Sequence, residues 1–177
     1  MKRFLLLSLL VTVCFAFTTL QLTPIDSKEG ISFTIKNFGL NSNGNISGLK
    51  GAIKWDDANP AASSFNVSVD VNTINTGIDG RDNHLKKEDF FDVAKYPQIT
   101  FVSTAISKNA DGTYQVAGNL TIKGVTKPVH IPFTVKMQGG NHEFEGEFSL
   151  NRKDYGVGGS SMTMSNDVKI KLNVQAK

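Results

Sequence analysis

Hydrophobic and polar residues alternate with a period of two along most of the chain beyond residue 30. Such alternation is typical of β-strands that have one buried face and one solvated face. In residues 65–71 the alternation is unbroken, because phenylalanine or valine occupies every second position. The pattern predicts eight strands, within residues 31–35, 46–55, 65–71, 98–107, 114–122, 129–137, 143–150 and 168–174.

The connections between many of these strands are short and rich in turn residues. Asn-Ala-Asp-Gly at residues 109–112 and the glycine pair at residues 139–140 are signals for hairpin turns. Short sequential hairpins favour an antiparallel up-and-down barrel over a sandwich, and closure removes the exposed strand edges. Residues 98–107 are apolar on both faces, so alternation alone does not fix the register of that strand.

Residues 75–97 interrupt the strand pattern with two glycines, many charges and a pair of adjacent phenylalanines. Residues 81–91 are predicted to form one short helix between the third and fourth strands, and Pro97 marks the end of the insert. We interpret this polar insert with an aromatic tail as a cover over one end of the barrel. In that interpretation three of its apolar residues face inward, namely Leu85, Phe90 and Phe91.

The inward-facing positions of the predicted barrel carry no lysine, arginine, aspartate or glutamate. An eight-stranded barrel has room for packed side chains or for one small ligand. Any guest would be apolar, because burying an unpaired polar group there is costly. A filled core is the competing interpretation, and alternation alone favours it. Gly51, Gly118 and Gly146 fall on inward positions, where they either leave volume unfilled or mark β-bulges.

The first residues have the features of a secretory signal peptide, since a basic start precedes an apolar run and small residues near Ala16. We therefore predict a signal peptide over residues 1–16 and a single domain over residues 17–177, in a periplasmic or otherwise exported location. Lipid anchoring at Cys14 is disfavoured because Val13 is not a small residue. Cys14 is the only cysteine, so a mature exported chain relies on its core rather than on disulfides.

Charge and short motifs exclude several function classes. Lys2 and Arg3 account for two of the 19 basic residues, which leaves 17 against 16 acidic ones. This balance gives no electrostatic footprint for nucleic acid. The sequence also has no G-x-S-x-G, P-loop or dinucleotide-binding pattern.

The strongest candidate for chemistry is His84, because the carboxylates Asp82 and Asp89 lie close to it in the sequence. Such a group could bind a metal or act as an acid–base pair. Neither a second histidine nor a cysteine accompanies it at ligand spacing, so a solvated histidine is the favoured interpretation. We therefore expect no catalytic residue, no metal site and no cofactor.

A specific combination of motifs runs through the chain. It comprises RDNHL at residues 81–85, DFFD at 89–92, KYPQITF at 95–101, GNLTIKGVTKPV at 118–129 and NRKDYGV at 151–157, with ISFTIKNFG at 31–39. Together these stretches resemble the YceI-like family of lipid- and polyisoprenoid-binding proteins, over residues 20–176. The resemblance implies a lipocalin-like antiparallel barrel that holds a long isoprenoid chain in an apolar tunnel. It also implies export, dimers in some members, and no established catalytic residues.

The resemblance and the alternation together predict an exported protein that sequesters or carries a polyisoprenoid-type amphiphile, of the isoprenoid quinone or polyprenyl phosphate class. The expected partners are this long-chain lipid, a membrane surface for its exchange, and a second copy in a homodimer. Three polar residues, Arg81, His84 and Lys86, are expected at the mouth near a headgroup. The expected tunnel lining comprises Phe33, Ile35, Ile53, Phe65, Val67, Val69, Leu85, Phe90, Phe91, Phe101, Leu120, Phe133, Phe148 and Leu172.

Two alternatives to lipid carriage stay open at this point. The first is a barrel that holds no ligand and acts through its outer surface in the cell envelope. The second is a hydrolase-type enzyme that uses His84 with Asp82 or Asp89.

Overall fold

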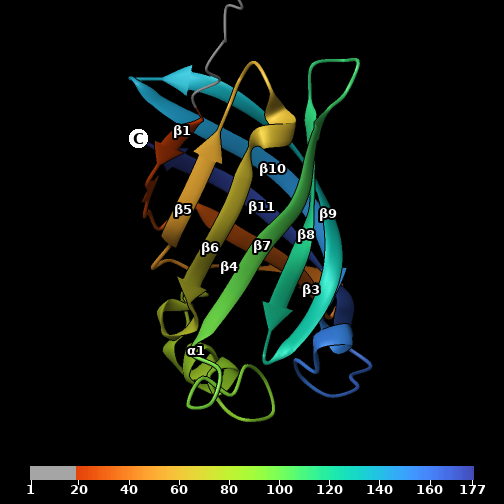
Figure 1. The fold of residues 1–177 in the computed structure, drawn as a ribbon. Helices are drawn as coiled ribbons and strands as arrows, with labels where there is room; N and C mark the ends of the chain where they lie inside the picture. The colour runs from red at the N-terminus through yellow and green to blue at the C-terminus, as the bar shows by residue number, and fades with distance from the viewer. Residues whose placement is uncertain (1–18) are drawn as a thin grey trace, which may run out of the picture.

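The structure is a computed structural model and describes residues 19–177. The predicted signal peptide and Cys14 therefore lie outside the described residues. Within residues 19–177, no helix is both long enough and apolar enough to cross a membrane. The described chain forms one antiparallel sheet of eleven strands, curled into a half-barrel with little helix (Figure 1).

The strands vary widely in length, and helical segments are few and short. The strands are β1 Leu20–Leu22, β2 Pro24–Ile25, β3 Ile31–Asn37, β4 Leu40–Asn45, β5 Lys50–Trp55, β6 Ser64–Asp70, β7 Gln98–Lys108, β8 Tyr114–Ile122, β9 Val125–Gln138, β10 Asn141–Asn151 and β11 Met164–Ala176. The helical segments are α1 Asp79–Leu85 and the 3-10 turns η1 Pro60–Ala62, η2 Val71–Thr73 and η3 Arg152–Tyr155.

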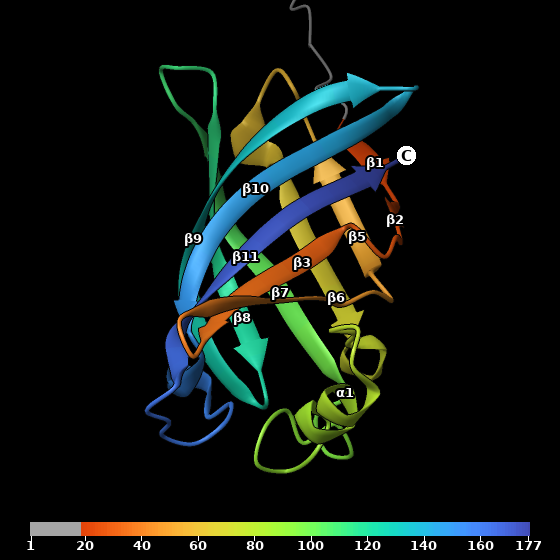
Figure 2. The ribbon, with the colours of Figure 1, turned by 180° about the vertical axis from the view of Figure 1, so that it is seen from behind.

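Strands β5 to β11 follow one another in chain order, each antiparallel to the next. The β3–β4 hairpin continues the sheet beyond β11, so an early hairpin lies beside the last strand (Figure 2). The N-terminal segment bridges two distant strands, because β1 pairs with β5 while β2 pairs with β11. Backbone hydrogen bonds between Thr23 and Lys177 reinforce this closure at one end of the barrel.

The prediction of eight strands was wrong, because three strands gave no readable pattern. β1 and β2 are too short for alternation to reveal them. β4 reads LNSNGN and has a single apolar residue, Leu40, so only its pairing with β3 makes it a strand. The strand predicted at residues 46–55 begins only at Lys50, and Ile46 and Leu49 lie in the preceding connection with their side chains buried.

Strand β7 explains why both faces of residues 98–107 are apolar. Phe101 and Ile106 are both buried although an even–odd alternation would place them on opposite faces. The pairing register with β8 shifts between Ser103 and Ala105. A β-bulge of this kind adds one residue to one strand and reverses which face the following residues present. Hydrophobic and polar residues therefore alternate on each side of the bulge, but the inward positions change from odd to even numbers across it.

The helix lies between β6 and β7, the strands predicted as the third and fourth, but it covers Asp79–Leu85 rather than residues 81–91. The chain turns after the helix, where the amide of Phe91 donates to the carbonyl of Leu85. Successive residues on a helix point about 100° apart. Because the helix has already ended at Leu85, the rings of Phe90 and Phe91 can both pack against the core although they are adjacent in the sequence.

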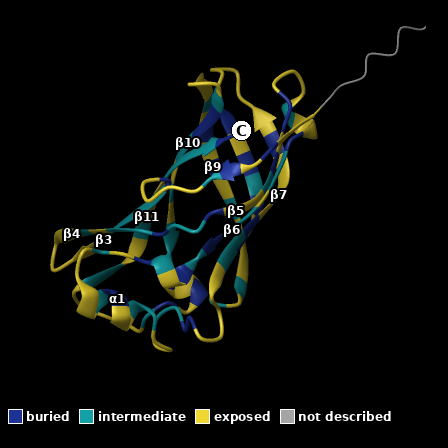
Figure 3. Ribbon diagram, turned by 90° about the vertical axis from the view of Figure 1, so that its left-hand side faces the viewer, coloured by how far each residue is buried: buried dark blue, intermediate teal, exposed yellow. Residues whose placement is uncertain are grey.

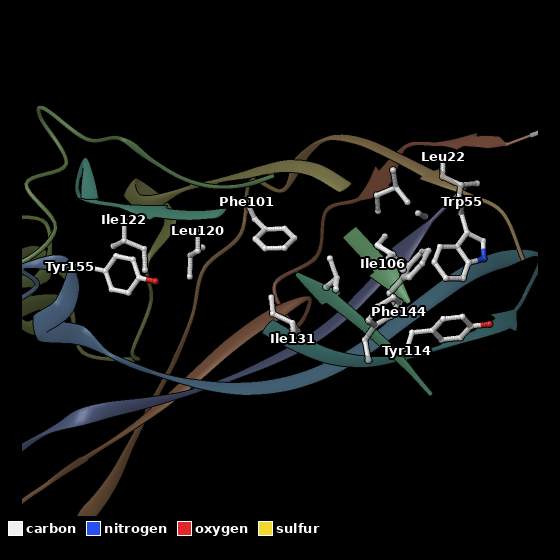
Figure 4. Close-up of a cluster of buried hydrophobic side chains, with 14 of the residues drawn as sticks. Leu22, Trp55, Phe101, Ile106, Tyr114, Leu120, Ile122, Ile131, Phe144 and Tyr155 are labelled. Atoms are coloured by element: carbon white, nitrogen blue, oxygen red, sulfur yellow. The ribbon is translucent and has the colours of Figure 1, made fainter. Parts of the chain in front are cut away.

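A closely packed aromatic group lies where β1, β5 and the start of β10 meet. Trp55 is 1% exposed there, with the rings of Tyr114 and Phe144 at 5.2 and 5.4 Å in edge-on contact. Figure 4 shows this aromatic group at one end of the core and Leu120 and Ile122 toward the other. Edge-on aromatic pairs add attraction beyond the apolar area they bury. This aromatic end is therefore a filled core.

Candidate functional site: an apolar cavity

The inward faces of the strands enclose a cavity of about 190 Å³ beside the aromatic end. Its walls are mainly valine, isoleucine, leucine and phenylalanine side chains from β3, β5 to β11 and the connection before β5. Polar residues are rare in the lining and are limited to Ser68, Thr100 and Glu145. Ordered water needs two to four polar partners, so a space with such walls suits an apolar guest.

The cavity lies among inward side chains that are only partly buried, beside the filled aromatic group. Large rings fill the interior around Trp55, whereas Val67 on β6 and Leu172 and Val174 on β11 are shorter and only half-buried. Gly146 also occupies an inward position of the wall. Figure 3 shows long stretches of intermediate burial on β3 and β11. The side chains on these facing walls leave a hollow of about 190 Å³ between them.

The three inward glycines have different surroundings, and the pairing register runs unbroken through Gly51 and Gly146. Gly146 lines the cavity, although a Cβ there would lie 2.9 Å from the carbonyl oxygen of Pro132. A Cβ at Gly118 would lie 2.6 Å from an atom of the Phe101 ring, so that space is already occupied. Gly51 has a φ of +126° and lies against the β6 backbone, which requires the freedom of glycine.

Most of the predicted tunnel residues line this cavity. Ile35 instead continues the inner face of β3 past the cavity, and Leu85, Phe90 and Phe91 pack against core residues without lining it. The lining also takes in Ile46 and Leu49, which belong to the predicted second strand but lie in the connection before β5. The predicted residues that line the cavity are Phe33, Ile53, Phe65, Val67, Val69, Phe101, Leu120, Phe133, Phe148 and Leu172.

Three chain segments meet at the end of the barrel opposite Trp55, namely the α1 insert, the β8–β9 turn and the loop after η3 (Figure 1). The Lys123 ammonium in the β8–β9 turn donates to the carbonyl oxygens of Glu88 at 2.7 Å and Gly156 at 2.9 Å. The amide of Gly158 donates to the carbonyl of Asp89 at 2.9 Å. One lysine therefore ties three segments together, and we call this assembly the cover.

Arg152 at the start of η3 is 4% exposed, and it holds the loop that follows. Its Nη1 donates to the carbonyl oxygens of Val157 at 2.8 Å and Gly159 at 3.0 Å, and its Nε donates to that of Ser165 at 2.9 Å. Burial lowers the pKa of the guanidinium, which nevertheless stays charged. The sequence did not predict that Arg152 would hold this loop. Its position inside the NRKDYGV motif was the one feature that set it apart from other charged residues.

The three residues predicted at the mouth have different surroundings. Arg81 is half-buried and turns back on its own segment, with Nε 2.8 Å from Thr76 Oγ1 and Nη2 2.9 Å from the carbonyl of Thr76. Lys86 is half-buried directly after α1. His84 is more than half exposed, and its ring lies edge-on to Phe90 at 5.0 Å. The guanidinium of Arg81 is thus committed to shaping the insert.

His84 pairs with one of its two candidate carboxylates. Its Nε2 lies 2.8 Å from Asp89 Oδ2, and this hydrogen bond holds the pKa of Asp89 below its usual value. Asp82 is buried and accepts hydrogen bonds from the amide and hydroxyl of Thr76 instead. Across residues 19–177, no cluster of three or more His, Cys, Asp or Glu side chains could hold a metal ion.

A curled antiparallel sheet around an apolar cavity is the architecture of lipocalin-like barrels, the class that usually holds one small apolar ligand. Comparison with known sequences makes the assignment more specific. The YceI-like domain family matches residues 22–176, and the chain belongs to that family.

Known relatives agree with this assignment. A UPF0312 protein of Yersinia pestis (strain Pestoides F) is 38% identical over 159 residues, which cover 84% of this chain and 82% of that protein. The crystal structure of Burkholderia cenocepacia BcnA is 28% identical with a TM-score of 0.79, covering 88% of this chain and 96% of that chain. A polyisoprenoid-binding domain from Saccharophagus degradans shares the fold with a TM-score of 0.69 at 15% identity, over 88% and 97% of the two chains.

Proposed function

We propose that this protein binds and carries a polyisoprenoid-type amphiphile, of the isoprenoid quinone or polyprenyl phosphate class, with its tail in the apolar cavity. The observation that carries the proposal is a cavity of about 190 Å³ with an almost wholly apolar lining. A related fold that is described as polyisoprenoid-binding supports the ligand class. Sequestration of this kind needs no chemical step.

The size of the cavity sets what fits in it. An apolar cavity of about 150 Å³ holds one benzene ring, so a cavity of about 190 Å³ has room for about one or two isoprene units. Each buried methylene group contributes about 0.8 kcal/mol before ordering costs. A longer tail therefore needs further apolar surface, and the half-buried inner face of β3 and β11 next to the cavity offers it.

We also propose where the protein works and what it meets there. The basic start and apolar run at the N-terminus support export to the periplasm through a cleaved signal peptide. A carrier of a membrane lipid must meet a membrane surface to load and release it. We include a homodimer as a further proposal, which rests on the family resemblance.

We propose further that the protein is not an enzyme. The acid–base candidate that the sequence marked is the His84–Asp89 pair, and both of its side chains are more than half exposed, at 56% and 57%. General acid–base catalysis gains most from a desolvated site of tuned pKa. The pair nevertheless gives the hydrolase alternative one specific observation. A His84→Ala variant that loses a measurable hydrolytic activity towards a lipid ester would favour that alternative.

Native mass spectrometry tests lipid carriage directly. The purified protein is offered an isoprenoid quinone or a polyprenyl phosphate in detergent, and a one-to-one complex is expected. A Val67→Trp variant places a large ring in the cavity and is expected to lose the complex. Val102 on the neighbouring strand is 43% exposed and does not line the cavity, so Val102→Trp is the matched control and keeps the lipid.

Failure of the wild-type protein to bind either lipid would leave the ligand-free envelope barrel as the better reading. Equal binding by Val67→Trp would show that lipid associates outside the cavity. Extraction of lipid from protein isolated from its own cells would then name the physiological ligand within the class.

A further inference from the structure

Three large apolar side chains project into solvent where two loops meet. Phe38 and Leu40 are 76% and 75% exposed at the β3–β4 turn, and Met162 in the loop before β11 is fully exposed. The amide of Phe38 donates to the carbonyl of Thr163 at 2.9 Å, so the two loops are joined. Figure 2 shows the β3–β4 turn beside the loop that leads into β11. We call Phe38, Leu40 and Met162 the apolar tip.

The backbone conformation at Phe38 is one that a phenylalanine rarely adopts. Phe38 has a φ of 51° and Gly39 a φ of 76°, between the paired residues Asn37 and Leu40. Two central residues of positive φ form a type I′ turn, in which Asn-Gly is strongly preferred and a bulky residue is disfavoured. The chain therefore displays an exposed phenylalanine at a position where its backbone conformation favours asparagine.

An apolar stripe links the tip to the cavity. Phe33 and Ile170 form a cross-strand pair in the cavity lining, and Ile35 and Val168 form the next inward pair along β3 and β11. Ile35 and Val168 are only half-buried, as is Met164 at the start of β11. Figure 3 shows the partial burial of these strands. The inner face thus offers continuous, partly exposed apolar surface from the lining to the tip.

The size and shape of the tip favour a lipid surface over a protein partner. Three side chains of this size present roughly 400–500 Å², whereas a stable protein interface buries about 800 Å² on each partner. Insertion into a bilayer interface needs only a few apolar side chains with cationic support. Lys36 is exposed two residues before Phe38, and the exposed Lys153 donates to Ser160 in the loop that carries Met162, at 3.2 Å. Both ammonium groups can meet anionic headgroups, an attraction that the exposed Asp154 partly offsets.

We propose that the apolar tip inserts into the surface of a lipid bilayer, and that the stripe behind it is the path of a lipid tail into the cavity. The docking surface stands on the exposed side chains themselves, whereas the path rests on the proposed function. The tip lies at the β3–β4 end of the half-barrel, away from the strand pairing that closes the aromatic end.

Vesicle binding tests the docking surface. Wild-type protein and variants with the same N-terminus are sedimented with vesicles of phosphatidylcholine and phosphatidylglycerol. Phe38→Asn and Met162→Ser together are expected to lower the partition onto vesicles by about tenfold or more. Met137 is also exposed, at 61%, but lies at the far end of β9, so Met137→Ser is the matched control and keeps the wild-type partition.

The thermal stability of Phe38→Asn shows whether this variant is still folded. Phe38→Asn creates the preferred Asn-Gly turn, so its midpoint of thermal unfolding is expected to equal or exceed that of the wild type. Loss of vesicle binding therefore cannot be attributed to unfolding. Met162→Ser alone changes a residue in a loop outside the sheet. Its vesicle partition is expected to fall, but by less than that of the double variant.

Each remaining outcome has a defined meaning. Absence of wild-type vesicle binding, or an equal loss in Met137→Ser, would overturn the docking surface. A wild-type dimer in light scattering that becomes a monomer in Phe38→Asn would also overturn it, because the tip would then be a protein interface. Lipid delivered in detergent should still bind to the tip variants, while its transfer from donor vesicles slows. Loss of detergent-delivered binding in every form, with vesicle docking intact, would defeat the proposed function alone.

Discussion

The two ends of the barrel share one alternating pattern but differ in how they are filled. At the aromatic end Trp55 and Ile106 are 1% and 3% exposed, and rings pack against one another at 5–6 Å. Farther along, Phe148 and Leu172 point inward from the same sheet but are only half-buried beside the cavity. Period-two alternation decides which side chains face inward, and the way they meet across the barrel decides whether the interior is solid.

The two ends also differ in how they are closed. The aromatic end is sealed by strand pairing, because β1 and β2 bridge β5 and β11. The opposite end is covered by segments that Lys123 and Arg152 hold through side-chain hydrogen bonds to carbonyl groups. Side-chain ties can open while every strand stays paired. The aromatic end is therefore closed by strands, and the opposite end is closed by segments that can separate without loss of strand pairing.

The largest expected effect comes from truncating the filled end. Trp55→Ala should lower the free energy of unfolding by about 3–5 kcal/mol, since it removes a fully buried ring from tight packing. Phe148→Ala should cost only about 1–2 kcal/mol, because that ring is half-buried and already faces empty space. Urea denaturation measures both. Equal losses would contradict the division into a filled and a hollow end.

Added volume should produce the reverse contrast. Ile106 is 3% exposed and does not line the cavity, so Ile106→Trp should destabilise the fold by about 1–3 kcal/mol through overpacking. Val67→Trp should cost less than about 1 kcal/mol, because the cavity can take the ring. Thermal unfolding of the two variants gives the comparison. A Val67→Trp protein as unstable as Ile106→Trp would mean that the cavity cannot accept a large group.

The cover should depend on its buried arginine. Arg152→Lys keeps the charge but cannot reproduce the fork of donors, so it should lower the free energy of unfolding by about 2–3 kcal/mol. Hydrogen exchange should rise mainly in residues 157–165, which the guanidinium holds. The adjacent Lys153 is exposed, and Lys153→Met should change stability by less than about 0.5 kcal/mol. Faster exchange spread evenly over β5 to β8 would argue against a local role.

The smallest expected effect is a pH response at the surface of the cover. The hydrogen bond from His84 lowers the pKa of Asp89 in the folded chain. A lowered carboxyl pKa adds stability above the unfolded value of about 3.9, and that stability is lost as pH falls through the folded value. The Asp89 carboxyl resonance should therefore titrate below that value and move toward it in His84→Ala. An unchanged titration midpoint of Asp89 in His84→Ala would show that the hydrogen bond from His84 does not lower the Asp89 pKa.

Much of the fold was readable because strand alternation is a local property. Residues 65–71, 114–122 and 129–137 fall within or close to β6, β8 and β9, and their inward residues are those that alternation marked. The same local logic failed where pairing alone makes a strand. β4 has three asparagines and one apolar residue, so its strand conformation comes from the partner β3 and the turn between them.

The site was only partly predictable for a similar reason. Phe90 and Phe91 were expected inside the tunnel, yet they pack against the core outside the cavity lining because the helix ends at Leu85. The sequence around Arg152 gives no sign that its guanidinium donates to four neutral oxygens in the segment that follows it. Contacts that depend on how a loop folds leave no periodic signal in the sequence.

The sequence by itself determined the all-β class, the inward faces and the apolar character of the interior, because these follow from alternation and composition. Only the tertiary structure decided that one end is solid and the rest hollow, since filling depends on which side chains meet across the barrel. It also decided the position of the apolar tip, because Phe38 and Met162 are far apart in sequence and come together only when β3 pairs with β11.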